Sequence, residues 1–392
     1  MIDLSCYGTG TAPYYGTVIP WRQLIFASSY YLNLRLDCGG RRSARKTLDC
    51  WPPLPLRISS EHLYPGGREE ASAIAVLEQR DRVCEIALSV WTLSEKMYTL
   101  LQQPFPMLTL LFLSNMGHMR TLPNEFLGGS ASRLHGLVEL ELRDMCHISP
   151  EVIVTSLSSL VKLSRFHLSF LSTVSRPDPI SRHSPPLTRT ILPALTRLSF
   201  EGFDEYLEDL IAQIDAPLLH ILSIKFFYRS TFDIQQVSQF ICRTEKFKSL
   251  NYGDLSFEIP WKGAEIKLDQ RNLDHSRNAL VLLGVVCNQI EQQVSAMAQI
   301  CNKFTPFLSY VEVLDIDFRF RVRGQEPVTN STEWFKLFRP FTSVEILSSS
   351  SMAGPYIASA LKQIGLEPGS TMEIFPALRT LFFASSSVGV IV

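Results

Sequence analysis

Apolar residues recur along this chain in one frame, at offsets 0, 3, 6 and 8, and polar residues fill most positions between them. Offsets 6 and 8 share one face of a short strand, whereas offsets 5, 7 and 9 share the other face. The frame therefore predicts a series of strands, each with one buried face and one polar face. The full copies are Phe105/Leu108/Leu111/Leu113, Leu134/Leu137/Leu140/Leu142, Leu160/Leu163/Phe166/Leu168, Leu192/Leu195/Leu198/Phe200, Ala216/Leu219/Leu222/Ile224, Leu308/Val311/Leu314/Ile316, Phe338/Phe341/Val344/Ile346 and Phe375/Leu378/Leu381/Phe383.

Between the predicted strands the apolar period changes to that of a helix. Ile153, Leu157 and Leu160 follow Ser149, an N-cap residue, and Pro150, which suits the first helical position. Further stripes of helical period are Leu207/Leu210/Ile211/Ile214 and Ile290/Val294/Met297/Ile300/Phe304. Strands of one frame separated by helices indicate a parallel sheet with the helices on its outer side.

Degenerate copies of the frame end at Leu88 and Tyr252, and successive copies from Leu88 to Tyr252 lie roughly 24–32 residues apart. A leucine-rich repeat has a period of about 20–29 residues and an LxxLxL core. We therefore predict an α/β fold, a leucine-rich-repeat-like solenoid with one short parallel strand and one helix per irregular repeat. The alternative is an ordinary α/β fold with leucine-rich strands, although such folds do not keep one register over many units.

The repeats assign most of the chain to one domain. We expect the solenoid to span residues 51–385, with an irregular part at 253–305 that contains strands near 264–268 and 279–286. The segment from Ser172 to Thr190, rich in Pro, Ser and Arg, is expected to be an exposed loop.

Composition narrows the class of partner. The chain has 392 residues, 46% of them hydrophobic, and a formal net charge of −1. Such a balance argues against a nucleic-acid or membrane-surface partner, both of which attract clustered Lys and Arg. The sequence contains no apolar stretch of about 18 residues, so it predicts no membrane-spanning helix. Eight cysteines without a CxxC pair are typical of an intracellular protein, so we expect a cytoplasmic or nuclear location, or both.

Several long strings resemble the F-box proteins with degenerate leucine-rich repeats of mushroom-forming fungi. The resemblance covers roughly residues 20–385. It implies the substrate receptor of an SCF-type ubiquitin ligase, with a Skp-type adaptor and a cullin as partners and a target protein bound by the solenoid. The strings are WRQLIFASSYYLNLRL (21–36), WPPLPLRI (51–58), LEQRDRVCEIALS (77–89), FLGGSASRL (126–134), ILPALTRLSF (191–200), EYLEDLIAQIDAPLL (205–219), FDIQQVSQFICRTEKFKSL (232–250) and FRPFTSVEIL (338–347).

The chain departs from that family where the F-box should stand. Residues 21–50 resemble only the end of an F-box and its connector, and their adaptor-side residues are Trp21, Leu24, Ile25 and Phe26. Residues 1–20 lack a leucine-rich helical pattern, and the tail 386–392 departs from the repeat. The alternatives are therefore an interaction scaffold without an F-box and a truncated gene product without adaptor binding.

No catalytic, cofactor-binding or metal-binding pattern is found in the sequence. Gly8 and Gly10 are not followed by the third glycine of a nucleotide loop, and the histidines form no metal-ligand pair. Cys146 beside His147 is interpreted as a buried thiol. We therefore predict a non-enzyme, with a hydrolase or transferase hidden in an α/β fold as the alternative of a different class. The basic cluster Arg41, Arg42, Arg45 and Lys46 is interpreted as a solvated loop, with a phosphate-binding or nuclear-import patch as the alternative.

The polar face of the strands is the candidate binding surface, expected on the concave side of the solenoid. A mixed-charge ridge there suits a polar protein partner, although solvated strand faces are the alternative interpretation. Adjacent strands lie about 4.8 Å apart, so the ridge is expected to be continuous. Its predicted members are Glu139, Glu141, Arg143, Arg165, His167, Arg197, Glu201 and Lys225.

Overall fold

The chain divides into two compact units, Met1–Ser175 and Arg176–Val392, called unit 1 and unit 2 below. The domain limits expected from the sequence remain predictions. The structure is a computed structural model, and it describes residues 34–39, 44–50, 53–115, 134–145, 148–171, 189–259, 263–270, 280–320, 331–350, 354, 356–358 and 374–384.

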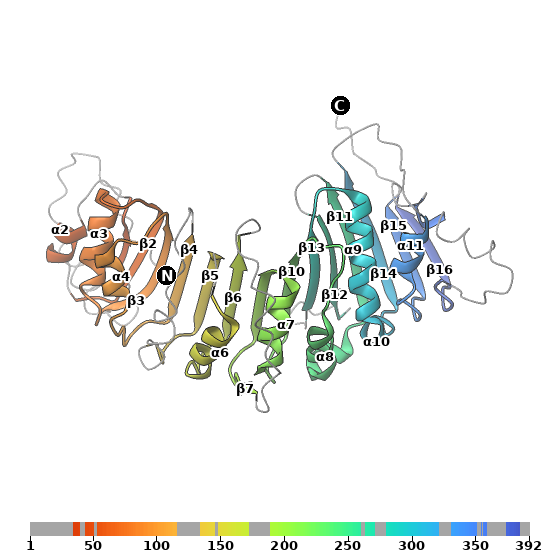
Figure 1. The fold of residues 1–392 in the computed structure, drawn as a ribbon, viewed down its shortest axis with the longest axis horizontal. Coiled ribbons are helices and arrows are strands. Elements are labelled where there is room, and N and C mark those ends of the chain that lie inside the picture. The colour runs from red at the N-terminus through yellow and green to blue at the C-terminus, as the bar shows by residue number, and fades with distance from the viewer. Residues whose placement is uncertain are drawn as a thin grey trace, which may run out of the picture. The chain divides into compact units, whose positions relative to one another are not determined.

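Unit 1 alternates strands and helices, and its strands lie side by side in chain order, β1 to β6, all parallel. In Figure 1 they run from the red part of the ribbon to the yellow part. Its elements are β1 (Leu34–Asp37), α2 (Ala44–Cys50), β2 (Leu56–Leu63), α3 (Arg68–Leu77), β3 (Val83–Val90), α4 (Glu95–Leu101), β4 (Leu110–Asn115), β5 (Glu139–Met145), α6 (Pro150–Ser158) and β6 (Arg165–Phe170).

Unit 2 also alternates strands and helices, but its strands do not lie side by side in chain order. Its main strands are arranged β8-β10-β13-β12-β11-β14-β15-β16, and β7 pairs separately with β9. Its elements are β7 (Thr190–Ile191), β8 (Arg197–Gly202), α7 (Asp204–Ala212), β9 (Ile214–Asp215), β10 (Ile221–Phe227), α8 (Gln235–Arg243), the 3-10 helix η3 (Glu245–Ser249), β11 (Tyr252–Ile259), β12 (Gly263–Asp269), β13 (Leu280–Val286), α9 (Ile290–Lys303), α10 (Thr305–Leu308), β14 (Val313–Phe320), α11 (Ser331–Phe338), β15 (Ile346–Ser350) and β16 (Thr380–Ala384).

The apolar frame corresponds to one recurring local structure. Its first two positions close a turn, because the N–H of Leu108 donates to the carbonyl of Phe105 at 3.1 Å, and later copies repeat this bond. Its last two positions form ladders across the sheet, where Leu111 pairs with Leu140 and Leu113 with Leu142. These residues are almost completely buried. Each buried leucine stabilises the fold by about 1.5–3 kcal/mol relative to an exposed one, so the frame is the core.

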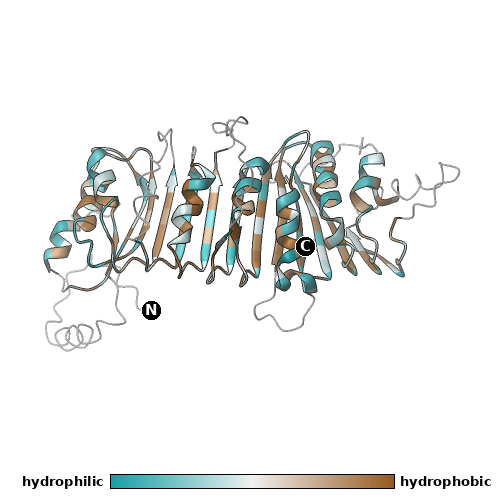
Figure 2. Cartoon of the chain, turned by 60° about the horizontal axis from the view of Figure 1, so that its bottom comes forward, coloured by the Kyte–Doolittle hydropathy of each residue, from teal (hydrophilic) through white to brown (hydrophobic). Residues whose placement is uncertain are grey.

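Within the described parts of the chain, helices cover the buried face of the strands and none lies over the other face (Figure 2). Figure 2 shows the helices lying over one side of the strands, and hydrophobic and hydrophilic bands alternating along several strands. Helix α3 contacts β2, α7 contacts β8, and α9 contacts β11, β12 and β13. The predicted class, an α/β leucine-rich-repeat-like solenoid, is thus confirmed by strand order, register and burial.

Two copies of the frame were predicted three residues too early. Leu347, not Ile346, pairs with Leu314, so this copy ends at Ser349, which is buried. The degenerate copy ending at Tyr252 likewise ends at Leu255, the register partner of Ile316. Phe338 stands three positions before the true start of the first copy, Phe341, and Tyr252 imitates a core position of the second. In both copies Ser or Gly occupies one true core position. The hydrophobic pattern alone therefore favoured the wrong register.

The final copy has the predicted register but not the predicted burial. Leu381 and Phe383 pair with Leu347 and Ser349 of β15. They are nevertheless 40% and 55% exposed, because β16 is the last strand of the sheet order.

The irregular part of the solenoid is an antiparallel excursion. The strands predicted near 264–268 and 279–286 are confirmed as β12 and β13, but β12 runs antiparallel to both of its neighbours. Only residues 260–262 separate β11 from β12. A parallel connection needs a dozen or more residues, so this short link requires a hairpin. Parallel pairing in every repeat was therefore a wrong prediction here.

Helix α6 begins at the cap that the sequence predicts. Ser149 accepts a hydrogen bond from the N–H of Val152 at 3.4 Å, and Pro150 opens α6, as predicted. The predicted stripes at Leu207 and Ile290 lie on α7 and α9. Ile214 is an exception, because it belongs to β9 rather than to the helix.

Candidate interaction surface

The predicted ridge lies on the strand face that carries no helices, which we call the open face. Glu139, Glu141 and Arg143 lie on β5, and Arg165 and His167 lie on β6, all in unit 1. The remaining three are in unit 2, where Arg197 and Glu201 lie on β8 and Lys225 lies on β10. The eight residues thus form one set in each unit, and continuity between the two sets remains a prediction.

In unit 1 the charges are paired with one another. Glu139 and Arg165 are register partners on β5 and β6, and their side chains form an ion pair of 2.5 Å. The Nε of Arg143 donates to Glu141 at 2.6 Å. Because each cation has a carboxylate beside it, the surface offers fixed hydrogen-bonding groups without a large net charge.

Strands β2 to β4 extend this surface with residues that the sequence analysis did not select. Arg57 and Glu85 form a second cross-strand pair, at 3.0 Å. Leu110 lies between the two ion pairs, since the register runs Arg57, Glu85, Leu110, Glu139 and Arg165 from β2 to β6. Applying offset 5 to the degenerate copy that ends at Leu88 selects Glu85, so this signal was present in the sequence.

An aromatic ring lies near the centre of the open face. Phe112 of β4 is half-buried, and the guanidinium carbon of Arg143 lies 5.3 Å from its ring centroid. Arg143 and Asp144 occupy a bulge, because the register of β5 with β6 shifts between Leu142 and Met145. A bulge redirects side chains, and the guanidinium of Arg143, at this bulge, lies over the ring of Phe112.

The bulge is fixed by hydroxyl groups from both neighbouring strands. Asp144 has a φ of 55°, a left-handed conformation that Asp tolerates better than most residues. Its N–H donates to Ser169 Oγ at 3.0 Å, and Ser114 Oγ donates to its carboxylate at 3.3 Å. Ser114 and Ser169 are each 5% exposed, so this arrangement is part of the sheet and not a loose surface contact.

His167 is uncharged at neutral pH in this surrounding. Burial lowers the pKa of its imidazole below the ordinary value of 6.5, and nearby Arg143 acts in the same direction. Glu141 and Asp144 oppose the shift. A neutral imidazole both donates and accepts hydrogen bonds, which suits recognition of polar groups.

In unit 2, the predicted Lys225 reaches across one strand. Its register partner on β13 is Gly284, whose missing side chain leaves the way open, and its ammonium pairs with Glu265 of β12 at 3.4 Å. Glu201 is the register partner of Lys225 on the other side. Glu265 was not selected from the sequence, because the hairpin that brings β12 beside β13 was not predicted.

Further polar residues of unit 2 lie on the same face. Tyr252 of β11 donates its hydroxyl to Asp315 of β14, and Lys267 pairs with Asp269 at 2.9 Å on β12. Burial raises the pKa of the Tyr252 phenol, and the hydrogen bond to Asp315 raises it further. This part of the open face therefore also consists of paired polar groups.

Metal-ligand clusters and cysteine thiols were sought within the described parts of the chain. No group of three His, Cys, Asp or Glu side chains there could hold a metal ion. Burial raises the pKa of the thiols of Cys38, Cys287 and Cys301 to about 12, so these thiols stay protonated at neutral pH. Among the same residues, no helix is both long and apolar enough to cross a membrane.

Other residues selected from the sequence do not belong to the open face. The adaptor-side residues Trp21, Leu24, Ile25 and Phe26 lie outside the described residues, as do Cys146 and His147. Of the basic cluster, Arg45 and Lys46 belong to α2 rather than to a loop, so the loop interpretation is wrong for these two.

The chain was compared with protein families, curated proteins and solved structures. No protein-family model and no curated protein matches this sequence. A similar solved structure is the leucine-rich repeat-containing protein LegL7 from Legionella pneumophila. It is 11% identical, the match covers 90% of each chain, and the TM-score is 0.36. The fold assignment therefore rests on strand order, register and burial within each unit.

Proposed function

We propose that this protein recognises a target protein through its open face and performs no chemistry on it. The arrangement of unit 1 carries the proposal. Two cross-strand ion pairs, Arg57–Glu85 and Glu139–Arg165, lie on either side of Leu110, and Phe112 lies two residues further along β4, on the same face. Protein interfaces commonly place an apolar or aromatic centre inside a polar rim. Isolated solvated strand faces have no need of such a centre.

The test is a capture experiment with two matched variants of the full chain. The first, Phe112→Ala combined with Arg165→Ala, removes the ring and one rim cation. The second, Lys162→Ala, removes an exposed lysine from the turn before β6 and serves as the control. Proteins held by the open face should be retained by the wild type and the control but lost at least about tenfold in the double variant, the effect of one interface hot spot. Equal retention by all three proteins would contradict the proposal.

At a finer level, we propose a substrate receptor of an SCF-type ubiquitin ligase. The support is the resemblance of long strings, including residues 21–36, to fungal F-box proteins with leucine-rich repeats. The alternative is the same solenoid acting as a scaffold without adaptor attachment. Co-purification of a Skp-type adaptor and a cullin with the protein from its own cells supports the receptor. Target capture without either of them supports the scaffold.

A further inference from the structure

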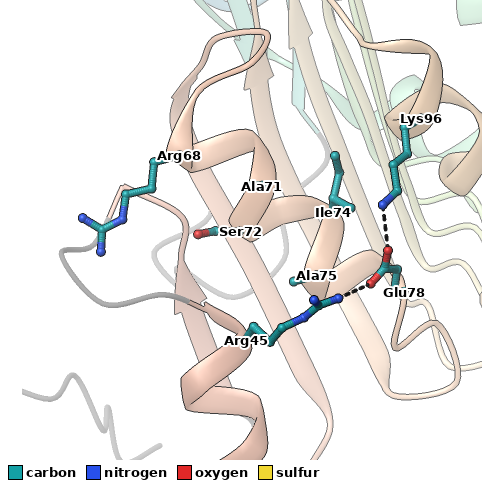
Figure 3. A pocket seen from close by; sticks show the side chains of 8 residues that line it. All are labelled: Arg45, Arg68, Ala71, Ser72, Ile74, Ala75, Glu78 and Lys96. Atoms are coloured by element: carbon teal, nitrogen blue, oxygen red, sulfur yellow. Dashed lines mark hydrogen bonds and ion pairs between the residues drawn. The ribbon is translucent and has the colours of Figure 1, made fainter.

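A second candidate site lies on the helix side of unit 1, away from the residues of the open face. Helices α2, α3 and α4 contribute side chains to a pocket of about 380 Å³ (Figure 3). This volume is within the range of small-ligand sites, about 300–1,000 Å³. Neither the apolar frame nor the proposed target recognition uses this pocket.

Small side chains of α3 create the space. Ala71, Ser72 and Ala75 share one face of the helix and line the pocket together with Ile74. Ser72 is only 6% exposed. A serine hydroxyl can donate a hydrogen bond, so this group can serve a ligand in the pocket.

The polar lining is cationic. Arg45 of α2, Arg68 of α3 and Lys96 of α4 contribute three positive charges, and Glu78 contributes the single negative charge. Figure 3 shows Arg45 and Lys96 converging on Glu78 from different helices. Arg45 Nη2 lies 3.2 Å from one carboxylate oxygen, and Lys96 Nζ lies 2.9 Å from the other.

Glu78 marks the place where an anion is held. The hydrogen bond from Lys96 lowers the pKa of its carboxyl group, and Arg45 adds to that effect. The same two cations leave the lining with an excess of positive charge even when Glu78 is ionised. Arg, Lys and hydroxyl donors are the groups that bind phosphate oxygens in proteins.

We infer that this pocket binds a phosphate monoester, with Arg45 and Lys96 neutralising its charge and Ser72 donating a hydrogen bond. A monoester carries about −1.5 to −2 charges at neutral pH, which the positive charges of the lining attract. The monoester can belong to a small molecule or to a phosphorylated side chain of a protein, and the two sources share this chemistry.

Binding is tested on the full chain at about 50 mM salt, where screening is weak. Phenyl phosphate is titrated by calorimetry, and a fluorescein-labelled phosphoserine peptide by anisotropy, with the unphosphorylated peptide as control. Binding of both phosphate probes indicates a general monoester site. Binding of the phosphopeptide alone identifies a phosphorylated protein segment as the source. Binding of neither probe overturns the inference.

Three variants locate the site and test the charge argument. Arg45→Ala combined with Lys96→Ala should weaken binding at least about tenfold, since each lost charge-assisted contact accounts for several-fold. Glu78→Gln should tighten binding about threefold, because the competing carboxylate is gone. Lys248→Ala on η3, another exposed and paired lysine, should leave binding unchanged.

The outcomes separate a built site from adventitious charge. Arg45 and Lys96 side chains are 73% and 61% exposed, so their removal should not unfold the protein, which circular dichroism verifies. Unchanged binding in the double variant, or weaker binding in Glu78→Gln, would overturn the inference.

Discussion

At the scale of single residues, a carboxylate from one helix supplies the cap that the next helix lacks. Helix α8 begins after Ile234, which has no side-chain acceptor for the first N–H groups. Glu208 of α7 accepts hydrogen bonds from the N–H groups of Gln236 at 2.7 Å and Val237 at 2.8 Å. Consecutive repeats of unit 2 are thus joined by a polar contact as well as by their apolar frame.

The Glu208 cap makes the stability of the protein depend on pH. Burial raises the pKa of Glu208 from 4.5 to about 7, despite its two backbone hydrogen bonds. The folded state therefore favours the protonated form, and this stabilisation is present below about pH 4.5 and is lost as the pH rises through 7. Allowing for partial solvent exposure, the loss by pH 8 is about 2 kcal/mol.

Glu208→Gln removes this titration while keeping an oxygen acceptor. Urea unfolding followed by circular dichroism at pH 5, 6, 7 and 8 should show wild type losing stability relative to the variant as the pH rises. A constant difference between the two proteins over that range would mean that Glu208 does not titrate near 7.

At the scale of secondary-structure elements, the antiparallel hairpin depends on one glycine. Gly263 opens β12 with a φ of +89°, and a Cβ there would lie 1.8 Å from the carbonyl oxygen of Val285. That oxygen belongs to the backbone of β13, so no side-chain rotation relieves the clash. The hairpin in turn brings Glu265 within reach of Lys225.

Substitution of this glycine should therefore disturb the whole hairpin. Gly263→Ala is expected to lower the free energy of unfolding by about 3 kcal/mol or more, because it adds a backbone clash to the left-handed strain. Gly66→Ala is the matched control, since Gly66 has a φ of +73° but nothing within 4 Å of its Cβ position. Its cost should be about 1 kcal/mol, from strain alone. Equal effects of the two substitutions in urea unfolding would refute the clash.

At the scale of the whole molecule, the repeated strand and its polar face could be predicted from the sequence more reliably than which strands lie side by side in the sheet. Glu139 and Arg165 could be paired from the frame, because their strands follow one another in the chain and keep one register from Glu139 to Leu142. The Glu265 contact of Lys225 could not be found, because it depends on a strand inserted out of chain order. The phosphate-site candidates Arg45 and Lys96 come from different helices, and no periodic signal joins them.

The bulge at Asp144 shows a second limit of sequence reasoning. The frame places Arg143 simply at offset 9 of a regular strand, whereas the register shift accompanies its guanidinium lying over Phe112. A bulge follows from backbone geometry and from the hydroxyl groups of Ser114 and Ser169, which are not adjacent to it in sequence. Offset 7 of the copy that starts at Phe105 places Phe112 on the open face, so only its contact with Arg143 required the structure.

The central claim is that the open face of unit 1 contacts a protein partner, and site-specific photocross-linking in the protein's own cells tests it most directly. p-Benzoylphenylalanine is placed at Phe112 in one variant and at Tyr310, 63% exposed in the turn before β14, in the control. The account predicts a discrete cross-linked partner from position 112 that is lost when Arg165 is also changed to Ala. Cross-links from position 310 alone, or none from position 112, would contradict it.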